Sequence, residues 1–272
     1  MFRNKQKITP SQQPVAIIGA GIAGLAAAAR LAVAGHPVTV FEAGSTFGGK
    51  MQQLTLPGGY RFDAGPSLFT LPQLVDDIFR LAHREPGDYF RYERLDPITN
   101  YFFADGTRLT AWADAAKFAA EVEAKLGTPA AAVTQFLRRA GKAYEATAGT
   151  FLHKSLHKAG TYFSPETLKA VAALPQLGLL GTMHQRHETA FGNDARLVQL
   201  FDRYATYNGS DPYQAPATLS MIPHLEHGIG AFYPEGGIYA IAVSLLRLAL
   251  ELGVKFRYDE VVEFFFLSEG LV

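Results

Sequence analysis

The fold of this chain is decided by ten residues near its N-terminus, Val15-Ala16-Ile17-Ile18-Gly19-Ala20-Gly21-Ile22-Ala23-Gly24. The apolar residues 15–18 predict a short buried strand, and the small residues of 22–34 predict a helix that ends at Gly35. Residues 38–41 alternate and are largely β-branched, so they predict a second strand. Together these segments predict a β-α-β unit within an α/β fold.

The glycine spacing in this stretch indicates a phosphate-binding loop. Gly19 permits a tight turn, Gly21 lets the backbone approach a pyrophosphate, and Gly24 lets the helix pack on the strand. The helix N-terminus then offers free N–H groups to the anion. Glu42 lies 18 residues beyond Gly24, where a carboxylate binds ribose hydroxyls and repels a 2′-phosphate, so FAD or NAD is favoured over NADP. The alternative is a glycine-rich turn that binds no ligand.

The residues after Glu42 favour FAD. The pair Gly48-Gly49 lets a second stretch of backbone approach the cofactor, and Lys50 adds positive charge near the phosphates. This arrangement resembles the flavin amine oxidase and carotenoid desaturase superfamily, which binds FAD, and Asp63-Ala64-Gly65-Pro66-Ser67 extends the resemblance to a segment that passes near the flavin ring. The expected cofactor-binding residues are Gly19, Ala20, Gly21, Ile22, Ala23, Gly24, Glu42, Ala43, Gly48, Gly49, Lys50, Gly65, Pro66, Ser67 and Val262.

Further segments point to one branch of that superfamily. Three segments resemble the corresponding segments of phytoene-desaturase-type enzymes. They are Tyr60-Arg61-Phe62-Asp63-Ala64-Gly65-Pro66-Ser67-Leu68-Phe69-Thr70, Arg203-Tyr204-Ala205-Thr206-Tyr207-Asn208-Gly209-Ser210-Asp211-Pro212-Tyr213 and Pro234-Glu235-Gly236-Gly237-Ile238-Tyr239. Ser155-Leu156-His157-Lys158 and Ile222-Pro223-His224-Leu225-Glu226 look closer still to the bacterial 1-hydroxycarotenoid 3,4-desaturases. The resemblance implies removal of two hydrogens from a (hydroxy)carotenoid, one of them as a hydride to the flavin. A phytoene desaturase is the alternative, and these segments disfavour an amine oxidase.

The resemblance also implies the domain organisation. A Rossmann-like FAD-binding domain is expected with an inserted α+β substrate domain, and both are expected to be incomplete at the C-terminus because the family continues for roughly as long again. The expected boundaries are a disordered tail at 1–14, a first FAD-binding segment at 15–70, a substrate-binding domain at 71–233 and a second FAD-binding segment at 234–272. The chain is therefore expected to be inactive by itself. The alternative is a non-catalytic dinucleotide- or carotenoid-binding module.

The middle of the chain holds the candidate substrate residues. Aromatic side chains suited to a polyene, or to an ordinary core, are Tyr162, Phe163, Phe191, Phe201, Tyr204, Tyr207, Phe232 and Tyr233. Arg203 is a weak catalytic candidate, since it could bind a hydroxyl end of the substrate, orient the flavin or pair with a nearby acid. The apolar run 171–181 is a candidate contact with a membrane surface, with burial as the alternative.

Composition excludes several classes of protein. The 272 residues include no cysteine, which rules out disulfides, Cys-ligated zinc, Fe–S clusters and a thioether-linked flavin. Lysine and arginine total 25 and balance 25 acidic residues, so nucleic acid is not an expected partner. The two H-x-x-H pairs, His184/His187 and His224/His227, come without a carboxylate ligand pattern, so no metal is expected.

The N-terminus resembles a signal peptide only superficially. Basic residues precede an uncharged stretch, but three glycines and Arg30 interrupt the apolar run. No segment reaches the roughly 20 apolar residues of a membrane-spanning helix. The expected location is the cytoplasm, with peripheral membrane association.

Overall fold

The computed structural model describes residues 13–151, 181–192 and 194–264. The chain divides into two compact units, the first formed by Met1–Glu93 with Phe232–Val272 and the second by Arg94–Ala231. Several sequence features lie outside the described residues: most of the expected N-terminal tail, Ser155-Leu156-His157-Lys158, Tyr162, Phe163, nearly all of the apolar run 171–181, and the last eight residues.

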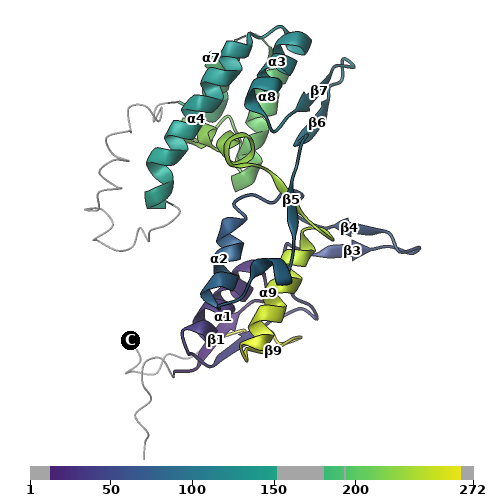
Figure 1. Ribbon diagram of the computed structural model, residues 1–272, viewed down its shortest axis with the longest axis vertical. Coiled ribbons are helices and arrows are strands. Elements are labelled where there is room, and N and C mark those ends of the chain that lie inside the picture. Colours follow the sequence, from purple (N-terminus) through teal and green to yellow (C-terminus); the bar gives the residue numbers. More distant parts are fainter. Residues whose placement is uncertain (1–12, 152–180, 193, 265–272) are drawn as a thin grey trace, which may run out of the picture. The chain divides into compact units, whose positions relative to one another are not determined.

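The first unit is built on a parallel sheet (Figure 1). Its elements are β1 (Val15–Ile18), α1 (Ile22–Val33), β2 (Val38–Phe41), β3 (Gln53–Thr55), β4 (Arg61–Asp63), α2 (Gln73–Leu81), the 3-10 helix η2 (Pro86–Asp88), α9 (Tyr239–Glu251) and β9 (Lys255–Arg257). The sheet has the order β1-β2-β9, with Val15 opposite Val38 and Val40 opposite Phe256. The predicted β-α-β unit is therefore confirmed, and β9 returns from the far end of the chain to extend the sheet.

Helices α1, α2 and α9 share the core of the first unit. Leu25 of α1, Phe79 of α2 and Leu245 of α9 are fully buried and belong to one apolar cluster. Helix α1 is rich in alanine, and such small side chains allow a neighbouring helix to approach closely, here α9. The apolar face of α2 is part of this core, and the N-terminal segment of this compact unit extends to residue 93. The end of the first FAD-binding segment at 70 stays a prediction.

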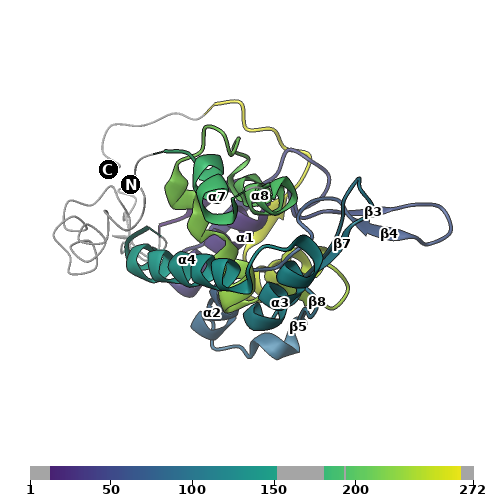
Figure 2. The same ribbon diagram turned by 90° about the horizontal axis from the view of Figure 1, so that it is seen from above.

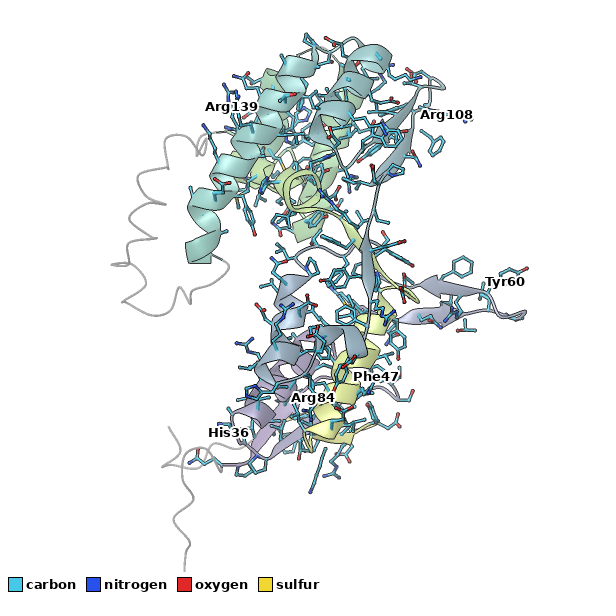
Figure 3. The ribbon with its side chains drawn as sticks, viewed as in Figure 1. His36, Phe47, Tyr60, Arg84, Arg108 and Arg139 are labelled. Atoms are coloured by element: carbon cyan, nitrogen blue, oxygen red, sulfur yellow. The ribbon has the colours of Figure 1, made fainter. Side chains whose placement is uncertain are left out.

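The hairpin of β3 and β4 presents apolar side chains to solvent. Leu54 lies opposite Phe62, and both are more than half exposed. Leu56 and Tyr60 follow on the same face, because alternate residues of a strand point the same way. Figure 3 labels Tyr60 on this hairpin.

Most of the helices that the structure describes lie in the second unit. Its elements are β6 (Thr99–Phe102), β7 (Arg108–Ala111), α3 (Ala115–Leu126), α4 (Ala130–Phe151), α7 (Met183–Phe191), α8 (Ala195–Asp202), the 3-10 helices η4 (Arg203–Asn208) and η5 (Ala217–Met221), and the π-helix η6 (Leu225–Ile229). The chain leaves the first unit through β5 (Tyr92–Arg94) and returns through β8 (Phe232–Pro234), and these two strands pair. Helices α7 and α8 lie side by side (Figures 1 and 2).

Local signals set the ends of these helices. The Asp114 carboxylate accepts from the N–H of Lys117 at the start of α3, and Gly127 ends that helix in the left-handed conformation. Thr182 and Gln185 form a capping box at the start of α7. Asp194 caps α8. Residues 127–129 separate the two Ala-rich helices α3 and α4.

The segment after α9 differs from the sequence-based expectation. Residues 254–266 are rich in apolar and aromatic side chains and predict a strand, but within the described residues the strand is confined to Lys255–Arg257. Beyond the strand the backbone hydrogen-bonds to the loop that follows β2. The N–H of Asp259 donates to Gly44 O at 3.1 Å, and the N–H of Glu260 donates to Glu42 O at 3.0 Å. These contacts draw the chain along residues 42–44 and away from a further strand pairing.

Candidate functional site

The loop between β1 and α1 has the geometry of a phosphate-binding turn. Gly19 has φ +96°, a conformation that L side chains rarely adopt. A Cβ on Gly24 would lie 1.9 Å from Gly19 O, so the helix reaches the turn only because this residue is glycine. Gly21 is the N-cap of α1 and no side chain caps the helix. The positive end of α1 is therefore available to an anion.

Glu42 lies at the end of β2, and its carboxylate faces the same loop. Its Oε2 accepts a hydrogen bond from the N–H of Ala20 at 2.6 Å, and its Oε1 accepts one from the N–H of Gly44 at 2.9 Å. The two bonds hold the carboxylate in one orientation beside the glycine turn. The remaining acceptor capacity of its two oxygens suits ribose hydroxyls.

The glycine pair Gly48-Gly49 packs directly on the phosphate loop. Gly48 forms an isolated bridge with Gly21, and its N–H donates to Ala20 O at 2.9 Å. A Cβ on Gly49 would lie 3.1 Å from the Cα of Gly21. The sequence assigned this pair to a close approach to the cofactor. The structure gives it a further task, which is to let two backbone segments touch.

The remaining predicted cofactor residues lie around these segments. A Cβ on Gly65 would lie 1.9 Å from Lys50 O, so the 65–67 segment passes over the backbone of Lys50. Lys50, Pro66 and Ser67 are exposed. Val262 is half-buried and follows Glu260, whose N–H binds Glu42 O. The structure thus gathers residues 19–24, 42–43, 48–50, 65 and 260–262 in the first unit.

Sequence reasoning missed the task of Asp63. Its Oδ1 accepts from the N–H of Ile238 at 3.0 Å, and its Oδ2 accepts from the hydroxyl of Tyr233 at 2.9 Å. A Cβ on Gly237 would lie 2.7 Å from Oδ1. Asp63 therefore fastens β4 to the start of α9, 175 residues later in the chain. The motif that contains Asp63 suggested only a cofactor contact.

In the second unit Arg203 pairs with a buried acid. Its Nη2 donates to Glu226 Oε2 at 2.9 Å, and Glu226 is 1% exposed. The hydroxyls of Tyr204 and Tyr207 donate to the same carboxylate at 2.9 and 2.7 Å. The guanidinium carbon also lies 4.4 Å from the centre of the Tyr204 ring. Of the roles considered for Arg203, pairing with an acid is the one that the structure displays.

Burial and the negative charge of Glu226 both raise the pKa of the tyrosines in this cluster. Desolvation raises the pKa of Tyr207, and the negative charge of Glu226 raises it further. The pKa of Tyr204 is raised for the same two reasons. Both phenols therefore stay protonated and serve as donors to Glu226 at neutral pH.

Several of the predicted substrate aromatics are core residues. Phe191 and Phe201 stack with their ring centres 4.5 Å apart, and both belong to the main apolar cluster of the second unit with Tyr204. Phe232 packs edge-on against Tyr92 in the first unit. Tyr207 is 37% exposed. From the sequence, these side chains could line a substrate tunnel or belong to an ordinary core. The buried ones belong to the core.

The two H-x-x-H pairs adopt different environments. Asp202 lies between His184 and His187, accepting from the Nδ1 of each at 2.6 Å. His227 is buried against Phe118, and desolvation lowers the pKa of His227 to about 4. Across the part of the chain that the structure describes, no group of three or more metal-ligating side chains could hold a metal ion.

The comparisons with known proteins agree with this geometry. Residues 22–263 match the family described as flavin containing amine oxidoreductase. The chain belongs to the flavin containing amine oxidoreductase family. The match includes helix α1, Glu42 and the glycine pair Gly48-Gly49.

Two curated carotenoid desaturases are similar to this chain along most of its length. The chain is 47% identical over 247 residues to the 1-hydroxycarotenoid 3,4-desaturase of Flavobacterium sp. (strain P99-3), covering 91% of this chain and 50% of the relative. It is 31% identical over 253 residues to the carotenoid 3,4-desaturase of Haloarcula japonica, covering 93% and 50%. The chain thus spans about half the length of these curated relatives.

Solved structures share the fold at low identity. Putrescine oxidase bound to putrescine superimposes with a TM-score of 0.56 at 17% identity, covering 90% of this chain and 51% of that one. An oxidoreductase from Methanosarcina mazei gives 0.52 at 18% identity, covering 91% and 51%. These likenesses establish the fold alone.

Among the described helices, none combines the length and apolar character needed to cross a membrane.

Proposed function

We propose that this chain carries the FAD-binding and substrate-binding segments of a carotenoid desaturase that introduces the 3,4 double bond into a hydroxylated carotenoid. The observation that carries the proposal is the 47% identity to a 1-hydroxycarotenoid 3,4-desaturase across 91% of the chain. The phosphate loop and Glu42 add the geometry that a dinucleotide needs. Related diapophytoene desaturases at 32% identity make a phytoene-type substrate the alternative.

The cofactor of the proposed enzyme is FAD. The glycine turn fits a pyrophosphate, because a Cβ on Gly24 would lie 1.9 Å from Gly19 O and the helix therefore reaches the turn only with glycine at this position. The N-terminus of α1 stabilises the phosphate charge, and Glu42 binds the adenosine ribose while repelling a 2′-phosphate. When bound, the flavin supplies the hydride acceptor of the desaturation. The protein binds and orients both reactants.

The proposed substrate is a lipid, so the proposal includes where in the cell the protein meets it. Carotenoids dissolve in membranes, so the proposal includes docking of the protein at a membrane surface from the cytoplasm. The exposed apolar face of the β3–β4 hairpin contributes Leu54, Leu56, Tyr60 and Phe62 to the surface of the first unit.

The test is expression of the gene in cells that accumulate defined carotenoids. The coding sequence is introduced together with its downstream reading frame, because the chain spans half the length of its relatives. Cells that accumulate a 1-hydroxycarotenoid are expected to form a pigment with one more conjugated double bond, seen as a red shift in the absorption of the extracted carotenoid. Conversion of phytoene but not of the hydroxycarotenoid would favour the alternative substrate. Conversion of neither would overturn the proposal.

A further inference from the structure

The second unit contains a cavity that the cofactor site does not use. It has a volume of about 870 Å³, opens to solvent, and lies along α7, α8 and the loop at 212–213. Its volume is within the usual range of small-molecule sites. His184, Glu188, Asp202 and Tyr213 supply polar groups, and Val198 and Pro212 supply apolar wall.

Asp202 is held rigidly at the edge of this cavity. It accepts from the Nδ1 of His184 and from the Nδ1 of His187, both at 2.6 Å. His187 is fully buried, and desolvation lowers its pKa, so it is a neutral donor that anchors the carboxylate. With both carboxylate oxygens occupied, Asp202 orients His184.

His184 and Glu188 then form a donor and acceptor pair on the cavity wall. The hydrogen bond to Asp202 raises the pKa of His184, which favours an N–H on its Nε2 as well. That Nε2 lies 3.4 Å from Glu188 Oε1, a long contact between two groups on consecutive turns of α7. Glu188 is 57% exposed and His184 is 18% exposed, so a ligand can reach both.

The charges on the wall exclude some ligands. Asp202 and Glu188 repel an anion, and the guanidinium of Arg203 is committed to Glu226. A hydroxyl group both donates and accepts, so it can bind a carboxylate and an imidazolium at once. The Tyr213 ring lies with its centre 4.1 Å from that of His184 and adds a flat face for carbon.

We propose that this cavity binds the hydroxylated end of the carotenoid, with Glu188 accepting from the hydroxyl and His184 donating to it. Val198, Pro212 and Tyr213 cover the adjoining hydrocarbon. This inference rests on the proposed function and adds which residues recognise the hydroxyl. Asp202 and His187 are positioning residues, since they act through His184.

The test compares two acyclic carotenoids that differ only in the hydroxyl. The chain is mixed with each carotenoid in detergent micelles, and the bound pigment is measured by visible absorption after gel filtration over a range of concentrations. The hydroxylated carotenoid is expected to bind about five- to tenfold more tightly, the value of one to two hydrogen bonds. Glu188→Ala is expected to remove most of that preference without changing the affinity for the hydrocarbon carotenoid.

Two further variants keep the result interpretable. Glu145→Ala removes an exposed acid from α4 of the same unit and is expected to retain the full preference. His184→Phe keeps an aromatic ring against Tyr213 and is expected to lose the preference, with thermal unfolding checking that the unit still folds. Equal affinity for both carotenoids in the wild type, or a preference that survives Glu188→Ala and His184→Phe, overturns the inference and leaves the proposed function standing. Failure of every carotenoid to bind counts against both.

Discussion

The carboxylate of Glu42 accepts a hydrogen bond from the backbone N–H of Ala20 at 2.6 Å and so ties the end of β2 to the glycine turn after β1. Twenty-two positions separate the two residues in sequence. The bond orients the acid beside the loop that would hold the pyrophosphate. Glu42 therefore shapes the site as well as offering oxygens to a ribose.

Replacement of Glu42 is expected to weaken flavin binding. Glu42→Arg removes the acceptor for Ala20 and places a positive charge where the ribose would bind. Loss of hydrogen bonds to a charged group costs about 1.5–3 kcal/mol each, so the flavin affinity should fall at least tenfold. The measurement is the flavin absorption retained by the purified gene product, titrated with added FAD. Glu85→Arg, an exposed acid of the same unit, is the control, and equal retention in both variants would exclude the ribose role.

Alanine at Gly24 is expected to disrupt the turn. The added Cβ would lie 1.9 Å from Gly19 O, which is backbone and cannot move aside without shifting the loop. Overpacking of this kind costs about 1–3 kcal/mol, so we expect a lower melting temperature together with reduced flavin binding. Gly87→Ala is the matched control, because a Cβ there meets nothing within 4 Å. Equal melting temperatures for the two variants would contradict the packing argument.

Asp63 is expected to stabilise the first unit through Tyr233 and the start of α9. Asp63→Ala removes both hydrogen bonds and should lower the free energy of unfolding by about 1–3 kcal/mol, whereas Tyr233→Phe should cost about 1 kcal/mol. Denaturant unfolding of the two single variants and the double variant gives their coupling energy. Strict additivity would show that the two side chains do not interact.

The buried pair of Arg203 and Glu226 is expected to be far more sensitive than an exposed one. Glu226→Gln leaves the guanidinium without its charged partner, and breaking a buried pair costs about 3–5 kcal/mol. Asp105→Asn breaks the exposed pair between Asp105 and Arg196, which should cost far less because solvent screens an exposed pair. Urea unfolding at pH 7 measures both. Similar losses in the two variants would argue against the structural role of Glu226.

His227 is expected to make the second unit sensitive to acid. Its pKa is lowered to about 4 by burial, while the same group in the unfolded chain titrates near 6.5. The unfolded chain therefore binds the proton first, and stability that is complete above pH 6.5 falls by up to about 1.4 kcal/mol per pH unit down to about pH 4. Urea unfolding at several pH values should show a shallower acid loss in His227→Phe, which keeps the stacking on Phe118. Parallel pH profiles for the variant and the wild type would contradict this role.

Local signals account for the parts of the fold that could be predicted from sequence. The strand at 15–18, the helix at 22–33 and the strand at 38–41 depend on periodicity and on turn residues within a few positions. The predicted segment end at 70 assigned α2 to the substrate-binding domain, and nothing within α2 itself indicates which core its apolar face joins. Only contact with Leu25 and Leu245 assigns it to the first unit.

By itself the sequence determined the glycine turn, the acid at Glu42 and the family to which the chain belongs, because each depends on residue types at short spacing. Only the tertiary structure decided the partners of Asp63, Arg203 and Asp202. Those partners lie 15 to 175 positions away, and a side chain chooses among distant polar groups only when the packed core has brought them within hydrogen-bond distance.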